Sequence, residues 1–130
     1  MKVAIATQNF TIVSGHAGQS RQWLVYDLGE HHSSRLLPAP QRIELAEDEV
    51  MHVFKDDRPH PLDGVDVVVA ASAGDGFVRH MRHRRADVLL TRESDPALAI
   101  THILAGEALP DPRFDVTTTL CKIRDLFSRY

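Results

Sequence analysis

The chain has 130 residues, 25% of them charged, a formal net charge of −3 and a single cysteine. Length and composition predict one globular domain whose core needs no disulfide or structural metal to support it. The negative net charge argues against nucleic acid as a partner. The single thiol excludes an intramolecular disulfide and fits a cytoplasmic protein, while no apolar run reaches the ~18 residues of a membrane-spanning helix, so no membrane partner is expected.

The first third of the chain predicts a β-meander. The expected strands are residues 2–7, 21–28 and 36–45, with a turn region over 8–18. The first two strands should be antiparallel, and Pro38 and Pro40 should place part of the third at a sheet edge or interrupt it. Residues 46–64 open with three acidic residues and later contain Pro59 and Pro61, so we expect a loop with one helical turn.

The second half predicts a β-α-β-α unit. Buried strands are expected over 65–71 (VDVVVAA) and 87–91 (DVLLT), and helices over 74–85 and 95–106. Ser94 or Asp95 can cap the second helix, Pro96 suits its first turn and Gly106 can end it. Its expected apolar face is Leu98, Ala99, Ile103 and Leu104. Such a unit requires parallel strands joined by right-handed crossovers, so the whole sheet should be mixed, with helices packed on it.

The remaining residues predict a connector over 109–115, which contains two prolines, and a terminal helix over 117–130. The packing stripe of that helix is Leu120, Ile123, Leu126 and Phe127. Cys121 lies early in it and could be an activated thiolate, although a lone cysteine is more often a small buried hydrophobic residue. Cys121 is therefore only a secondary candidate metal ligand.

The segment Ser14–Ser20 (SGHAGQS) carries the first candidate site. Gly15 and Gly18 flank His16 with small residues and allow a tight turn with unusual torsions that approaches a ligand closely. Neutral imidazole is a common metal ligand, but one histidine cannot hold a free metal ion tightly. His16 could instead bind a preassembled cofactor that brings most of its own coordination. The alternative is an ordinary polar turn residue.

The segment ASAGDG over residues 71–76 lies between a buried strand and a helix. Gly74 and Gly76 would let backbone N–H groups at the helix N-terminus face an anion. The third glycine of a dinucleotide fingerprint is absent, so a nucleotide site is a weaker reading, and a plain strand-to-helix turn is equally compatible. A small enzyme or nucleotide-binding protein using this turn is accordingly the third and weakest functional hypothesis.

The helix that follows is basic over residues 79–85 (RHMRHRR). Arg79 is a candidate for offsetting the charge of an anionic ligand, and the run as a whole would also suit an acidic partner. His80 and His83 lie three residues apart, but we expect both to be surface residues because no carboxylate is near them in sequence. The other histidines receive no role. No sequence motif pairs a nucleophile with a base, so no catalytic residues are predicted.

Taken in order, these stretches resemble the dinitrogenase iron–molybdenum cofactor biosynthesis family, which comprises NifX and NafY type proteins and the C-terminal domain of NifB. The matching stretches are Gly15-His16-Ala17-Gly18 with Trp23 and Val25-Tyr26-Asp27, then 67–70 with Gly74-Asp75-Gly76, then Leu90-Thr91, Glu93, Asp95-Pro96 and Leu104-Ala105-Gly106. The chain departs from the family pattern at Ala17, where phenylalanine is usual, and at Arg85, where a helix-ending glycine is common.

The resemblance implies a ribonuclease H-like α/β fold, with a cofactor-binding domain over 1–106 and a C-terminal extension over 107–130. It implies a non-catalytic protein that carries an iron–sulfur or iron–molybdenum cluster, or its precursor, between nitrogenase assembly proteins or to apo-dinitrogenase. His16 would then be a metal ligand, and Gly15, Gly18, Gly74, Gly76 and Arg79 would complete the cofactor-binding set. The alternative is a protein-interaction or regulatory module for the same assembly that binds no cluster.

Overall fold

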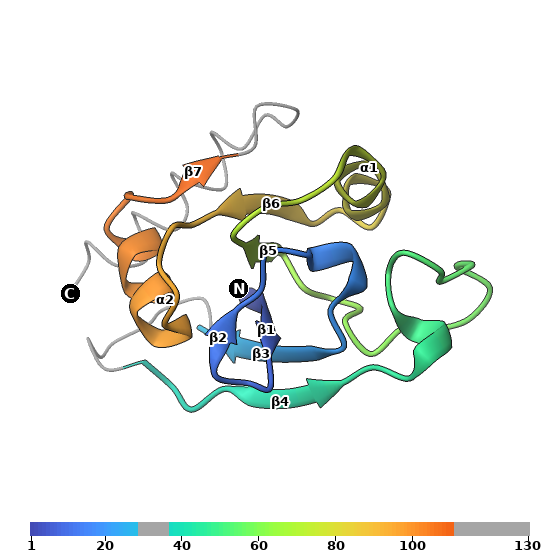
Figure 1. The fold of residues 1–130 in the computed structure, drawn as a ribbon, viewed down its shortest axis with the longest axis horizontal. Helices are drawn as coiled ribbons and strands as arrows, with labels where there is room; N and C mark the ends of the chain where they lie inside the picture. Colours follow the sequence, from blue (N-terminus) through green and yellow to red (C-terminus); the bar gives the residue numbers. More distant parts are fainter. Residues whose placement is uncertain (29–36, 111–130) are drawn as a thin grey trace.

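A computed structural model describes residues 1–28 and 37–110 of the chain. Within them, seven strands form one mixed sheet in the order β4-β3-β1-β5-β6-β7, and β2 pairs with β1 (Figure 1). The predicted α/β fold with a mixed sheet and packed helices is confirmed. The predicted terminal helix over 117–130, with Cys121, lies outside the described residues. None of the helices described is long and apolar enough to cross a membrane.

The predicted N-terminal meander is confirmed, with different bounds. Strand β1 (Lys2–Gln8) pairs antiparallel with β3 (Gln22–Asp27), which pairs antiparallel with β4 (Gln41–Glu44). The third strand is shorter than the expected 36–45 and begins directly after Pro40, because proline has no N–H to donate to a sheet. A two-residue strand, β2 (Ile12–Val13), pairs with the end of β1 inside the predicted turn region.

The predicted β-α-β-α unit is also present. Strand β5 (Val67–Ala70) runs parallel to β1 and to β6 (Asp87–Leu90). Helix α1 (Asp75–His83) joins β5 to β6, and α2 (Pro96–Leu104) follows β6. The connector expected over 109–115 begins instead with a short strand, β7 (Leu109–Pro110), which pairs antiparallel with β6 at the sheet edge.

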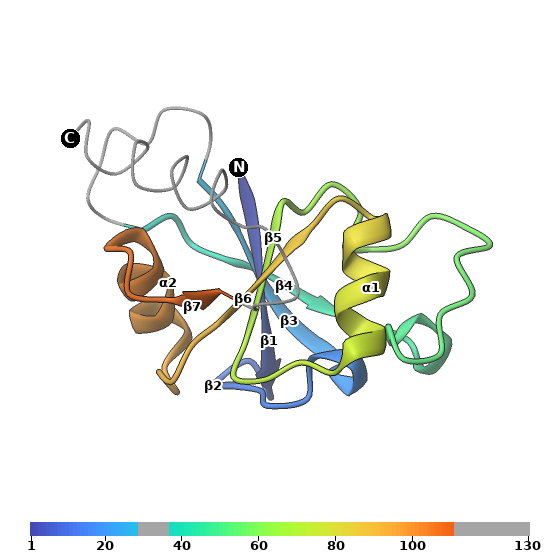
Figure 2. The ribbon, with the colours of Figure 1, turned by 90° about the horizontal axis from the view of Figure 1, so that it is seen from above.

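The two helices cover opposite faces of the sheet (Figure 2). Because side chains alternate along a strand, the odd-numbered residues Val3, Ile5, Val67 and Val69 pack with α2, whereas Ala4, Ala6, Val68 and Ala70 pack with α1. The expected apolar face of α2 is wrong at one position: Leu98 is 50% exposed, and Ile100 is buried in its place. Asp95 caps α2 as predicted, and Gly106 follows it with a φ of +80°.

Candidate functional site

Two small-residue loops meet where β1 and β5 end. The backbone N–H of Ala71 donates to the Ser14 carbonyl at 3.0 Å, and the Ser72 hydroxyl donates to the Gly15 carbonyl. Ser14 in turn donates its N–H to the carbonyl of Ala6 in β1 at 2.8 Å. The fold therefore brings together the two segments that the sequence singled out, although more than fifty residues separate them.

His16 has a fixed backbone and an exposed side chain. Its N–H donates to the Ser14 hydroxyl, and its carbonyl accepts from the Ser20 hydroxyl, both at 3.0 Å. A single-turn 3-10 helix, Ala17–Gln19, starts immediately after it. Its imidazole makes no hydrogen bond within the described part of the chain. The loop is thus held in place while the ring stays available to a ligand.

The glycines of these loops contribute small size rather than unusual torsions, which corrects the sequence interpretation. Positive φ angles at glycine in the described residues occur at Gly64 and Gly106 and not in the two loops. A Cβ added at Gly74 or Gly76 would meet no atom within 4 Å, so these two positions face open space. A Cβ at Gly18 would lie 3.7 Å from the Phe77 side chain, at ordinary contact distance. Their effect is to leave room beside His16.

A third segment closes the site, and sequence reasoning missed it. The loop over 51–64 follows the expected helical turn, which forms at Glu47–Glu49, and it contributes Met51, His52, Phe54 and Asp56. The N–H of His52 donates to the Gly18 carbonyl at 2.7 Å and joins this wall to the His16 loop. No periodicity marked the segment, and its contacts with Gly18, His80 and Arg84 join it to distant parts of the chain.

The three segments and α1 line an open cavity of about 700 Å³. Its lining contains five of the predicted site residues, namely Gly15, His16, Gly18, Gly74 and Gly76. Arg79 is exposed on α1 and is not part of the lining. His52, Asp56 and His80 also line the cavity, although none of them was among the predicted site residues. Cys121 lies outside the described residues, so its predicted role stays a prediction.

His80 is not the plain surface residue that the sequence suggested, whereas His83 is exposed. The side chain of His80 is only 15% exposed, and its Nε2 lies 2.8 and 2.7 Å from the two carboxylate oxygens of Asp56. The missing carboxylate is therefore supplied by a loop 24 residues earlier in the chain. Hydrogen bonding by His80, with the neighbouring charge of Arg84, holds the pKa of Asp56 below its usual range.

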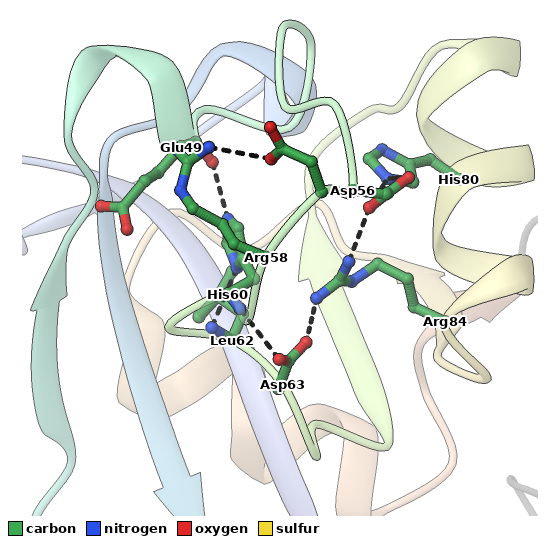
Figure 3. A network of polar contacts seen from close by, with 9 residues as sticks. Glu49, Asp56, Arg58, His60, Leu62, Asp63, His80 and Arg84 are labelled. Carbon is green, nitrogen blue, oxygen red and sulfur yellow. Dashed lines mark hydrogen bonds and ion pairs between the residues drawn. The ribbon is translucent and has the colours of Figure 1, made fainter.

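The buried side chain of His60 holds the loop over 51–64 in place through two hydrogen bonds. Its Nε2–H donates to the Glu49 carbonyl at 2.6 Å, and its Nδ1 accepts the Leu62 N–H at 3.0 Å (Figure 3). Because a carbonyl only accepts and an N–H only donates, both bonds require the neutral ring with its proton on Nε2. Burial lowers the pKa of His60 accordingly. Phe54 packs on this ring at 4.7 Å between centroids.

The donors in the cavity are spread over its walls. Within residues 1–28 and 37–110, no three side chains of His, Cys, Asp or Glu are grouped closely enough to hold one metal ion. His16, His52 and His80 nevertheless line one cavity from three different segments. This arrangement suits separate contacts to a larger, polyatomic group rather than chelation of a single ion.

Solved structures with the same fold support this description. The protein PH0822 is 18% identical, with a TM-score of 0.63, over 86% of this chain and 97% of its own. A Thermotoga protein of the DUF35 family is 16% identical, with a TM-score of 0.59, over 88% and 96%. The apo form of the orange protein from Desulfovibrio gigas is 13% identical, with a TM-score of 0.60, over 85% and 92%. At these identities the likeness shows the fold alone.

No curated protein matches the sequence. The family model described as dinitrogenase iron–molybdenum cofactor does match it, over residues 1–106. That span holds every element from β1 to α2 and all three segments that line the cavity. The chain therefore belongs to the dinitrogenase iron–molybdenum cofactor family, whose members are associated with the biosynthesis of that cofactor.

Proposed function

We propose that this protein carries an iron–sulfur or iron–molybdenum cluster, or its precursor, during nitrogenase cofactor biosynthesis, without catalysing a reaction. The observation that carries the proposal is the cavity of about 700 Å³ beside the available imidazole of His16. Family membership over 1–106 supplies the class of cargo. His16 would ligate one metal atom of a cluster that keeps the rest of its own coordination.

The residues present fit such a cargo. Imidazole is a suitable ligand for iron, and the cavity volume falls within the roughly 300–1,000 Å³ range of ligand pockets. The glycines leave room for a bulky group to approach the backbone, and the N-terminus of α1, at Gly74, favours negative charge nearby. Among the described residues, the lining offers imidazole rather than thiolate ligands.

The proposal is tested by anaerobic titration of the protein with isolated iron–molybdenum cofactor, followed by visible absorption and electron paramagnetic resonance. The His16→Ala variant should bind at least about tenfold more weakly, which corresponds to ~1.4 kcal/mol. Its free energy of unfolding should be unchanged, because His16 is exposed and its ring makes no hydrogen bond in the described residues. The His83→Ala variant, also exposed but outside the cavity, is the matched control.

Two results would contradict the carrier role. The first is that the unaltered protein does not bind the cofactor. The second is that His16→Ala binds it as tightly as the unaltered protein, which would remove His16 as a ligand. The protein isolated anaerobically from its own cells should also contain iron, and molybdenum if the finished cofactor is the cargo.

The alternative proposal is an interaction module for nitrogenase assembly that binds no cluster. The exposed side of α1 favours it, since Arg79, Arg82 and His83 all face solvent there. Such a basic surface would suit an acidic partner, such as an assembly protein or apo-dinitrogenase. Partner binding that survives His16→Ala but is lost in the double variant Arg79→Glu/Arg82→Glu would favour the interaction role.

A further inference from the structure

Asp56 lies between His80 and Arg84 at the edge of the cavity. Its carboxylate oxygens lie 2.7 and 2.8 Å from Nε2 of His80, and its Oδ1 lies 2.7 Å from Nη1 of Arg84 (Figure 3). Both partners extend from the α1 side, whereas Asp56 belongs to the loop over 51–64. The contact therefore joins the loop wall to the helix wall of the cavity.

Arg84 fixes the position of Asp56. Its guanidinium also contacts the carboxylate of Asp63 and lies 5.6 Å from the ring centroid of Phe54. The side chain of Arg84 is only 17% exposed, whereas the side chains of Asp56 and Asp63 are 49% and 52% exposed. Asp56 itself has a φ of +57°, in the left-handed region that aspartate adopts more readily than most residues other than glycine.

The arrangement decides which nitrogen of His80 carries a proton. An ionised carboxylate only accepts hydrogen bonds, so Nε2 of His80 must be the donor to Asp56. In the neutral ring the lone pair is then on Nδ1, and Nδ1 has no hydrogen-bond partner within the described residues. A carboxylate that orients one imidazole nitrogen while the other binds a metal is a recurrent arrangement in metalloproteins, and it raises the basicity of the ligand.

We propose that His80 is a second protein ligand of the cargo, bound through Nδ1, and that Asp56 and Arg84 are its positioning residues. The inference rests on the proposed carrier function and deepens it. His16 would hold the cargo from the loop after β2, and His80 would hold it from α1, across the same cavity. Two ligands on separate elements fix the orientation of a cluster, which a single ligand cannot do.

The tautomer of His80 is tested in the cargo-free protein by long-range ¹H–¹⁵N correlation spectra of the imidazole nitrogens. The neutral ring should carry its proton on Nε2 and leave Nδ1 unprotonated. The Asp56→Asn variant should lose this preference, since an amide can donate as well as accept. A neutral ring protonated on Nδ1 in the unaltered protein would overturn the proposal, whatever the protein binds.

The ligand role is tested by the same anaerobic titration with isolated iron–molybdenum cofactor. His80→Ala should weaken binding and change the electron paramagnetic resonance spectrum of the bound cofactor. Asp56→Asn, which keeps the size of the side chain, should weaken binding by about tenfold through its effect on His80. His83→Ala, on the same helix but outside the cavity, should do neither. Thermal unfolding followed by circular dichroism checks that each variant is folded.

The outcomes separate this inference from the carrier proposal. If His16→Ala loses binding while folded His80→Ala and Asp56→Asn both bind like the unaltered protein, the carrier function stands and the role of His80 is wrong. If the unaltered protein does not bind the cofactor, both proposals fail. Equal weakening in His80→Ala and His16→Ala, with a spectral change in each, supports two ligands.

Discussion

Helices α1 and α2 have the same length, yet their N-termini differ. Each has nine residues and follows a strand of the parallel part of the sheet. Asp95 closes the first turn of α2 by accepting the Leu98 N–H at 3.1 Å, and Pro96 occupies the first position. The corresponding residue of α1 is Gly74, which has no side chain to cap with and faces the cavity. The N-terminus of α2, which Asp95 caps, belongs to the scaffold, whereas the N-terminus of α1 has no side-chain cap and borders the site.

The largest loss of stability should come from a substitution in the core beneath α2. Ile100 is 1% exposed and packs on the face of the sheet opposite the cavity. Ile100→Ala should lower the free energy of unfolding by about 2–5 kcal/mol, because it removes buried methyl groups and leaves a void. Denaturant titration measures the loss. Affinity for the cofactor should be unchanged where the variant is folded, and a parallel fall in affinity would contradict the division between the two faces.

A smaller effect is expected from the cap of α2. Asp95→Ala should lower the free energy of unfolding by about 1 kcal/mol, because the first-turn N–H of Leu98 loses its acceptor. Asp95→Asn is the matched control, since asparagine caps a helix about as well as aspartate. Thermal unfolding of both variants measures the difference. An equal loss in the two variants would show that the charge of Asp95, and not its cap, supports α2.

Acidification should loosen the cavity wall through His60. Because burial lowers the pKa of His60 in the folded state, the unfolded chain binds its proton first, at about pH 6.5. The stability from neutral His60 is therefore complete above about pH 6.5 and is lost as the pH falls through the folded pKa. His102 on α2 has the opposite sign, since its hydrogen bond to Glu107 raises its pKa. Unfolding free energies measured from pH 5 to 8 should fall toward acid in the unaltered protein and do so less in His60→Gln.

The smallest change in stability is expected from closing the open end of α1. Gly74 has an extended conformation with nothing within 4 Å of an added Cβ, so Gly74→Ser and Gly74→Asp should both fit and stabilise α1 by a few tenths of a kcal/mol. Binding should separate them. Gly74→Asp brings a negative charge to the cavity and should weaken binding of an anionic cluster, whereas Gly74→Ser should change it less. Equal affinities would argue against an anionic cargo at this end of α1.

Much of the scaffold could be predicted because it depends on short-range patterns. The apolar runs of β5 and β6 and the helical spacing of Phe77, Val78 and Met81 predicted the elements that form. The cap at Asp95 was visible because its partner is three residues away. Strand β7 was missed because it has only two residues, one of them Pro110. It is recognised as a strand only through its pairing with β6.

The candidate site was predictable only in part, since its other half depends on contacts between distant residues. The His16 loop and the Gly74 turn each have a local signature, and the fold brings them together. His80 was dismissed because its carboxylate partner, Asp56, lies on a loop without periodicity. Gly15 and Gly18 were identified partly for their torsions, whereas neither has a positive φ in the structure. Local sequence patterns therefore identified the two loops of the site, whereas its other walls could be recognised only from tertiary contacts.

The hydrogen bond from the His52 N–H to the Gly18 carbonyl joins the two walls nearest His16. A hydrogen-bonded amide exchanges with deuterium only when its bond opens. The exchange rate of the His52 amide therefore measures how often the two walls separate. The neighbouring amide of Phe54 bonds within its own loop, to the Val50 carbonyl, and measures the local loosening of that segment alone. The difference between these two rates reports how often the cavity opens, in a protein that needs no label or bound metal for the measurement.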